Sequence, residues 1–151
     1  MSESPRPESS EERSRNIRRM FDDISPRYDL LNTVLSFGRD RSWRKRAVRM
    51  LNPPEGARLL DLACGTGDFA LAALRYCPGI GSIIGIDFAE NMLALARKKY
   101  EKRRVGIPYE FRFGDATQLP LEDESVDAVT IAFGIRNVVD VPAALREMHR
   151  V

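Results

Sequence analysis

The 151-residue sequence has few of the residues that define several protein classes. It contains two cysteines, Cys64 and Cys77, and one histidine, His149. Two cysteines cannot form the framework of a disulfide-rich domain, and one histidine excludes a histidine-rich metal site, so we expect no metal. No apolar run approaches the ~18 residues that a transmembrane helix needs.

The first residues are acidic, rich in serine and proline, and almost without apolar side chains. We therefore expect a disordered tail over residues 1–14. This stretch also lacks the apolar centre of a secretory signal, and with so few cysteines the sequence indicates a cytoplasmic protein with reduced thiols. The net charge of +2 requires no polyanion, so we expect no nucleic-acid partner.

The most informative stretch is 58–70, RLLDLACGTGDFA. An apolar run typical of a strand is followed by Gly65-Thr66-Gly67 and then by a helical pattern. Glycines allow a ligand to approach the backbone closely, and the start of a helix offers unpaired N–H groups. The stretch predicts a strand, a glycine loop and a helix that together bind a nucleotide-type ligand; the alternative is a plain turn capped by Thr66 or Asp68. Asp61 is costly inside this apolar strand unless something pairs with it.

Strand and helix patterns alternate after the glycine loop. Strands are predicted at 82–87, 109–113 and 128–133, and helices at 69–76, 89–104 and after Pro142. This order predicts a doubly wound, mainly parallel α/β sheet of the Rossmann-like kind, with strands one to four present. The ligand crevice should then lie at the carboxyl ends of the strands.

Acidic residues at two of these strand ends are candidates for binding a nucleoside. Asp87 stands twenty positions after Gly67, the spacing of a ribose-binding acid, although it could instead cap the next helix. Asp115 could accept a hydrogen bond from an adenine amine while Ala116 offers its backbone, or Asp115 could simply form a turn. Met92 could touch the adenine face or pack in the core.

Residues 15–52 are predicted to form a separate helical segment that closes the site. A basic helix through about Leu51 carries Arg41, Arg44, Lys45, Arg46 and Arg49, with Trp43, Ala47, Val48 and Leu51 available for burial. The basic run is either a solvated helix face or a surface attracted to an anionic membrane.

The motifs together resemble a class I S-adenosylmethionine (SAM) methyltransferase, in which an acid commonly occupies the position of Asp61. Residues 28–43, with Tyr28-Asp-Leu-Leu-Asn32, and residues 133–140, FGIRNVVD, resemble the two signatures of the ubiquinone/menaquinone biosynthesis C-methyltransferase family. The similarity runs from about Ser14 to the end. The glycine motif is specific only to the superfamily, whereas the two signatures together are much more specific.

The resemblance implies methyl transfer from SAM to a ring carbon of a demethylated, prenylated quinol. By this similarity Thr66, Asp87, Asp115 and Ala116 contact SAM in a 53–151 domain, and Asp61, Gly65 and Gly67 shape its pocket. Tyr28 would close the site, while Arg136 and Asn137 would act on the acceptor. Arg136 stays protonated, so it would orient water or stabilise a phenolate; the alternative is a salt bridge to a nearby acid such as Asp140.

The family normally continues through further C-terminal strands that this sequence lacks. Residues 126–132 would then form an exposed apolar edge, which a homodimer could cover. We therefore also consider a SAM-binding module without turnover, a small NAD-dependent oxidoreductase and an RNA methyltransferase. The sequence does not distinguish a benzoquinol from a naphthoquinol acceptor.

Overall fold

The computed structural model describes residues 16, 20, 37 and 39–151. The predicted tail, the first signature with Tyr28 and most of the 15–52 segment lie outside the described residues. The elements are α3 (Asp40–Val48), β1 (Ala57–Leu62), α4 (Asp68–Tyr76), β2 (Ile80–Asp87), α5 (Glu90–Arg103), β3 (Tyr109–Phe113), β4 (Ala128–Ile131), the 3₁₀ helix η2 (Phe133–Asn137) and α6 (Val141–Arg150).

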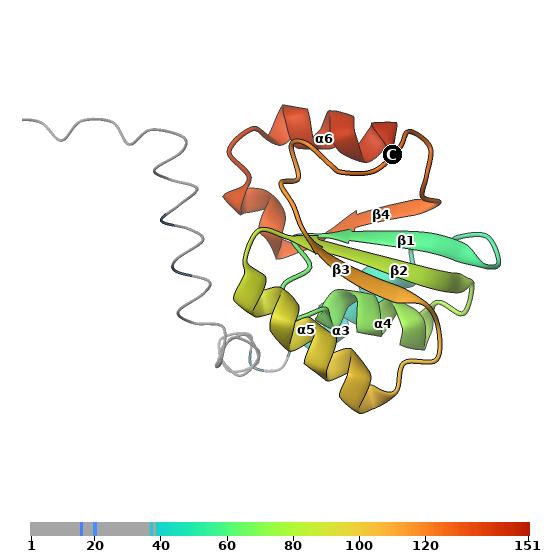
Figure 1. Cartoon of the computed structure of the whole chain (residues 1–151). Helices are drawn as coiled ribbons and strands as arrows, with labels where there is room; N and C mark the ends of the chain where they lie inside the picture. Colours follow the sequence, from blue (N-terminus) through green and yellow to red (C-terminus); the bar gives the residue numbers. More distant parts are fainter. Residues whose placement is uncertain (1–15, 17–19, 21–36, 38) are drawn as a thin grey trace, which may run out of the picture.

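Four strands form one parallel sheet in the order β3-β2-β1-β4. The register places Asp61 of β1 between Gly85 of β2 and Thr130 of β4. Helices cover both faces, with α6 above the sheet in Figure 1 and α3, α4 and α5 below it. This confirms the predicted doubly wound α/β fold.

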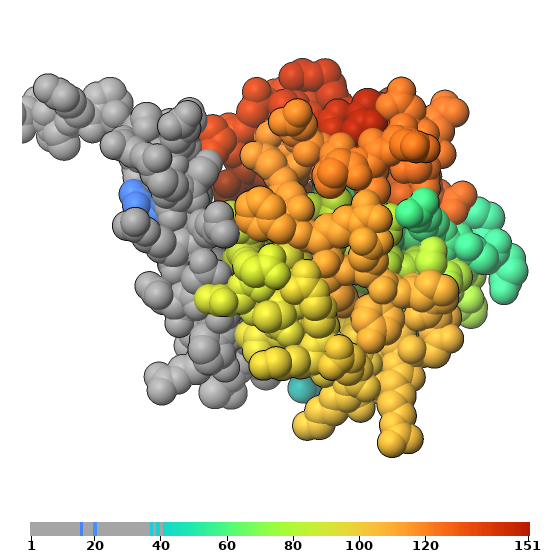
Figure 2. Space-filling view, viewed as in Figure 1, coloured from blue at the N-terminus to red at the C-terminus, as the bar shows by residue number. Residues whose placement is uncertain are grey.

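Each face of the sheet has its own apolar core. On the side of α3, α4 and α5, the core includes Leu59 and Ile83 from the strands and Tyr100 from α5. On the side of α6, Leu60 and Leu62 pack against the chain that joins β3 to β4. In Figure 2 this connection, in orange, spreads over the front of the molecule between α5 and α6. Successive side chains of β1 therefore enter the two cores in turn, as expected for a strand covered on both faces.

The structure differs from the sequence-based expectation at two elements. The fourth strand ends at Ile131 rather than at residue 133, because the chain turns there into η2 and leaves Phe133 48% exposed. Trp43 on α3 remains 50% exposed instead of buried, since Val48 fills the position that faces the core. Among the described residues, no helix is both long and apolar enough to cross a membrane.

Candidate active site

The loop between β1 and α4 has an unusual backbone. Ala63, Gly65 and Gly67 all have positive φ, at +49°, +54° and +77°. Glycine takes this left-handed conformation freely, whereas alanine does so at a cost of about 1 kcal/mol or more. The loop thus turns the chain sharply at the carboxyl end of β1 and leads directly into the N-terminus of α4.

Gly67 is required by packing as well as by its backbone angle. A Cβ atom at this position would lie 2.8 Å from the ring of Tyr100 and 3.3 Å from that of Phe111. The Tyr100 hydroxyl donates a hydrogen bond of 3.1 Å to the Gly67 carbonyl. The loop therefore rests directly on the aromatic core between α5 and β3.

Two cations from other helices hold the start of α4. Lys99 of α5 donates to the hydroxyl of Thr66 at 2.8 Å and forms an ion pair of 2.6 Å with Asp68. Arg44 of α3 reaches the other carboxylate oxygen of Asp68 at 3.4 Å. The basic run of α3 is therefore not a purely solvated face, and Lys99 of α5 turns toward the glycine loop.

Asp61 is a buried carboxylate that has a hydrogen-bond partner at only one of its two oxygens among the described residues. Its Oδ1 accepts a 2.8 Å hydrogen bond from the Thr130 hydroxyl, whereas its buried Oδ2 has no partner in the described structure. Burial raises the pKa of Asp61 to about 7, an effect that the Thr130 bond partly opposes and the nearby Asp87 charge reinforces. An unpaired buried oxygen of this kind suits a cationic or hydrogen-donating ligand.

Asp87 connects the glycine loop to the segment before α5. Its Oδ2 accepts from the Gly65 amide at 2.7 Å, and its Oδ1 accepts from the Ala89 amide at 2.9 Å. The N-cap of α5 is Ala89 and carries no side-chain cap, so Asp87 is not the N-cap considered from the sequence. A ribose would have to share this carboxylate with the two backbone donors.

The opposite wall of the site comes from the second signature. Gly134 lies against Ala63, since a Cβ on Gly134 would be 2.2 Å from the Ala63 Cβ. Asp140 caps α6 by accepting from the Ala143 amide at 2.8 Å. Within the described part of the chain no ion pair links Asp140 to Arg136.

These walls enclose a cleft of about 760 Å³, part of it open to solvent. Most of the residues predicted from the sequence lie together in its lining: Asp61, Gly65, Thr66, Asp87, Met92, Arg136 and Asn137. Met92 is also 1% exposed, so it belongs both to the core and to the cleft wall.

Three predicted cofactor residues do not line this cleft. Gly67 lies behind it against Tyr100. Asp115 is exposed and accepts from the amide and the hydroxyl of Thr117, both at 2.8 Å, as a turn-forming aspartate does. Ala116 packs against the core below α6. The roles of Asp115 and Ala116 toward a ligand remain predictions.

Sequence reasoning missed several residues that shape the site. Arg44 and Lys99 stand in basic runs, where periodicity alone does not reveal which cation turns inward. Thr130 carries a visible signal, because it is a hydroxyl in an otherwise apolar strand. Cys64 also lines the cleft, but burial raises the pKa of its thiol well above the ordinary value, so it remains protonated near neutral pH.

Comparison with known proteins shows which family the chain resembles. The pattern of the ubiE/COQ5 methyltransferase family matches residues 8–151. Ubiquinone/menaquinone biosynthesis C-methyltransferase UbiE of Geobacter sulfurreducens is 49% identical over 144 residues, which are 93% of this chain and 55% of that protein. Demethylmenaquinone methyltransferase of Thermus thermophilus is 52% identical over 132 residues, covering 87% of this chain and 59% of the relative.

A solved structure shows the same fold. The crystal structure of a SAM-dependent methyltransferase from Thermotoga maritima superposes with a TM-score of 0.66 at 30% identity, over 87% of this chain and 55% of that one. The chain thus spans somewhat more than half the length of the relatives it matches. With the family pattern covering nearly all of its sequence, the chain belongs to the ubiE/COQ5 methyltransferase family.

Proposed function

We propose that this protein takes part in SAM-dependent C-methylation of a demethylated, prenylated quinol. The observation that carries the proposal is the cleft in which Asp61, Thr66 and Asp87 meet Arg136 and Asn137. We favour demethylmenaquinol as the acceptor, because the Thermus thermophilus relative is named for demethylmenaquinone and the Geobacter sulfurreducens relative for menaquinone as well as ubiquinone.

The donors and charges on one side of the cleft fit SAM as cofactor. Asp61 presents a buried carboxylate oxygen that has no partner among the described residues, which suits the positively charged ammonium of SAM. Asp87 would accept from the ribose hydroxyls, with Thr66 and the glycines next to the aminoacyl part and Met92 at the adenine; Asp115 and Ala116 would complete the adenine site. When bound, SAM supplies a methyl group activated by the positive charge on its sulfur.

The other side of the cleft suits the acceptor. Arg136 is exposed at the cleft, and the positive charge of its guanidinium would favour the phenolate form of a quinol ring. Asn137 can donate to a ring oxygen and fix its orientation. We further propose that the 15–52 segment, through Tyr28 and α3, closes the site and excludes water.

The setting of the reaction is part of the proposal. A quinol with an isoprenoid tail is held in a lipid bilayer, so we place the protein in the cytoplasm with a peripheral contact to the membrane surface. The sheet order leaves β4 at an edge of the sheet, and we propose that a second copy of the chain covers this edge.

Two assays on the 151-residue chain test the proposal. Calorimetry should detect SAM binding, with no comparable heat from NADH. Incubation with methyl-labelled SAM and a demethylated quinol should yield labelled, methylated quinone. SAM binding without product would favour a binding module over an enzyme, and binding of NADH but not SAM would contradict the cofactor assignment.

A further inference from the structure

We propose that the outer face of α3 is the surface that docks this protein on an anionic lipid bilayer. The proposal assigns specific residues to the membrane contact, and it rests on the proposed function only in that the acceptor is held in a bilayer. The contact itself can be measured without SAM and without quinol.

One stripe of α3 and its ends combines cations with large apolar side chains. Arg39, Trp43, Arg46 and Met50 follow one another at intervals of four, three and four positions, which places them on one side of a helix. All four are exposed, with Trp43 at 50% and Met50 at 79%. Just before the helix, Phe37 is 92% exposed. We call these five residues the α3 stripe.

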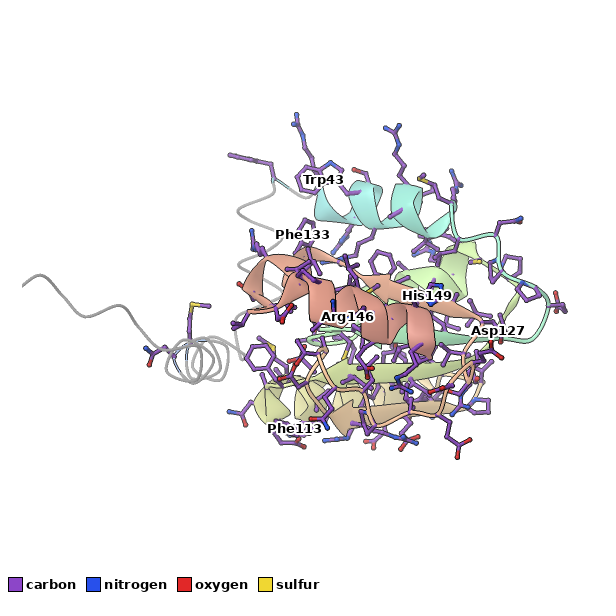
Figure 3. The ribbon with its side chains drawn as sticks, turned by 90° about the horizontal axis from the view of Figure 1, so that it is seen from above. Trp43, Phe113, Asp127, Phe133, Arg146 and His149 are labelled. Atoms are coloured by element: carbon purple, nitrogen blue, oxygen red, sulfur yellow. The ribbon has the colours of Figure 1, made fainter. Side chains whose placement is uncertain are left out.

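The opposite side of α3 is already occupied by the protein. Val48 is fully buried in the core, and Arg44 reaches Asp68 in the glycine loop. The helix is therefore anchored through one face, and the α3 stripe is the face left toward solvent. In Figure 3, α3 lies along the upper margin of the molecule, with long side chains extending away from the sheet.

The positive charge of residues 37–50 favours binding to an anionic partner. Residues 37–50 include six basic and one acidic side chain. Within the described part of the chain, neither Arg39 nor Arg46 pairs with a carboxylate. Lys45 and Arg49 lie 5.2 and 5.9 Å from the ring of Tyr76, which adds positive charge beside the stripe. An anionic lipid surface attracts clustered basic residues, and exposed tryptophan and other large apolar side chains among them can enter the interface.

The α3 stripe also adjoins the mouth of the cleft. The ring centroids of Trp43 and Phe133 are 6.3 Å apart, and Phe133 lines the cleft. Figure 3 shows the two rings together, at the end of the sheet opposite Asp127 and the start of β4. A bilayer on the α3 stripe would therefore lie beside the opening through which an apolar acceptor must enter.

Trp43 makes this contact directly measurable, because it is the single tryptophan of the chain. The protein is mixed with anionic vesicles, made of equal parts phosphatidylcholine and phosphatidylglycerol, and with neutral vesicles of phosphatidylcholine alone. We expect the anionic vesicles to shift Trp43 emission to shorter wavelength and to protect it from acrylamide. The shift should be much weaker with neutral vesicles and should decrease as salt is added.

Two matched variants test the surface. R39Q/R46Q should weaken binding to the anionic vesicles by about tenfold or more. K98Q/K102Q removes the same charge from two exposed residues of α5, which lies at the opposite margin of the molecule in Figure 3, and should bind as the wild type does. Thermal melts by circular dichroism confirm that both variants fold.

Absence of a Trp43 shift with anionic vesicles would overturn the proposal, and an acidic protein partner would then be the better explanation of the stripe. An equal loss in both variants would also overturn it, because general charge rather than the α3 stripe would govern binding. Calorimetry with SAM on the same preparations separates this proposal from the proposed function: either interaction can be lost while the other is retained.

Discussion

The Asp61 carboxylate lies in a buried environment that disfavours its negative charge. It is 1% exposed, in the middle of a parallel sheet, and one of its oxygens has no partner in the described structure. Thr130 on the neighbouring strand offsets part of the cost by donating to the other oxygen. A buried group of this kind is more readily explained by a ligand than by stability, because an apolar side chain would fill the same space without the penalty.

The raised pKa of Asp61 predicts how stability depends on pH. Because burial raises this pKa from 3.8 to about 7, the folded protein holds the proton more tightly than the unfolded chain does. The contribution of Asp61 to stability is therefore complete below about pH 4 and is lost as the pH rises toward 7 and beyond. Asp61→Asn should reduce the difference in unfolding free energy between pH 5 and pH 8 by about 2 kcal/mol.

Urea titrations of both proteins at the two pH values measure this difference. Glu122→Gln is a suitable control, since Glu122 is an exposed carboxylate with no hydrogen bond or ion pair among the described residues. An unchanged pH dependence in Asp61→Asn would mean that Asp61 is already ionised in the folded protein at pH 5.

The proposed ribose role of Asp87 can be separated from its role in holding the loop. Asp87→Ala should weaken SAM binding by about tenfold or more, through the loss of charge-assisted hydrogen bonds to the hydroxyls. The same substitution also frees the Gly65 amide, which could lower affinity for any ligand. Calorimetry with S-adenosylhomocysteine and its 2′,3′-dideoxy analogue resolves the two effects. A ribose contact predicts a much smaller loss for the analogue, whereas an equal loss for both ligands would leave only the role in the loop.

At the scale of elements, contacts from α3, α5 and η2 hold the glycine loop and the start of α4. Lys99 of α5 and Arg44 of α3 both reach Asp68. Gly134 at η2 fits against Ala63 without space for a Cβ. A loop held from three directions keeps its amide groups oriented before a ligand arrives, which reduces the ordering cost of binding.

The contact between η2 and the loop predicts a rescue. Gly134→Ala should destabilise the protein by roughly 1–3 kcal/mol, because the new methyl group would overlap the Ala63 Cβ. Ala63→Gly alone should be nearly neutral, since it relieves the left-handed backbone of Ala63. The double variant should recover most of the lost stability, because the next nearest atom of Ala63 is 3.6 Å away. Denaturant unfolding of all four proteins gives the coupling energy, and additive effects would contradict this packing.

The ion pairs of α5 predict a selective effect on the cofactor. Lys99→Met should lower the unfolding free energy by about 1 kcal/mol and weaken SAM binding by roughly fivefold, because Thr66 and Asp68 lose a shared partner. Lys98→Met is the matched control, since Lys98 is the exposed neighbour on the same helix. Similar changes in both variants would mean that the charge of the helix, rather than the contacts of Lys99 with Thr66 and Asp68, causes the effect.

At the scale of the whole molecule, the sequence predicts the order of helices and strands better than it predicts which side chains of different elements contact one another. Tyr109–Phe113 alternates so clearly that the predicted and observed strands coincide. The Gly65–Gly67 turn and Asp87 could be placed at one end of the sheet because parallel strands all end there. By contrast, exposed and inward-facing cations look alike in a helical pattern, so the pairing of Lys99 and Arg44 with Asp68 could not be predicted. Trp43 was misjudged because large apolar residues are usually buried.

The edge of the sheet gives the last prediction. β4 pairs with β1 on one side, and in the described part of the chain no strand pairs with its other side. Unpaired N–H and C=O groups on such an edge favour pairing with a second chain. If a homodimer covers β4, its thermal unfolding midpoint should rise as protein concentration increases a hundredfold, because association stabilises the folded state by mass action. Sedimentation equilibrium over the same range should show a dimer, whereas a monomer with a constant midpoint would contradict the proposed assembly.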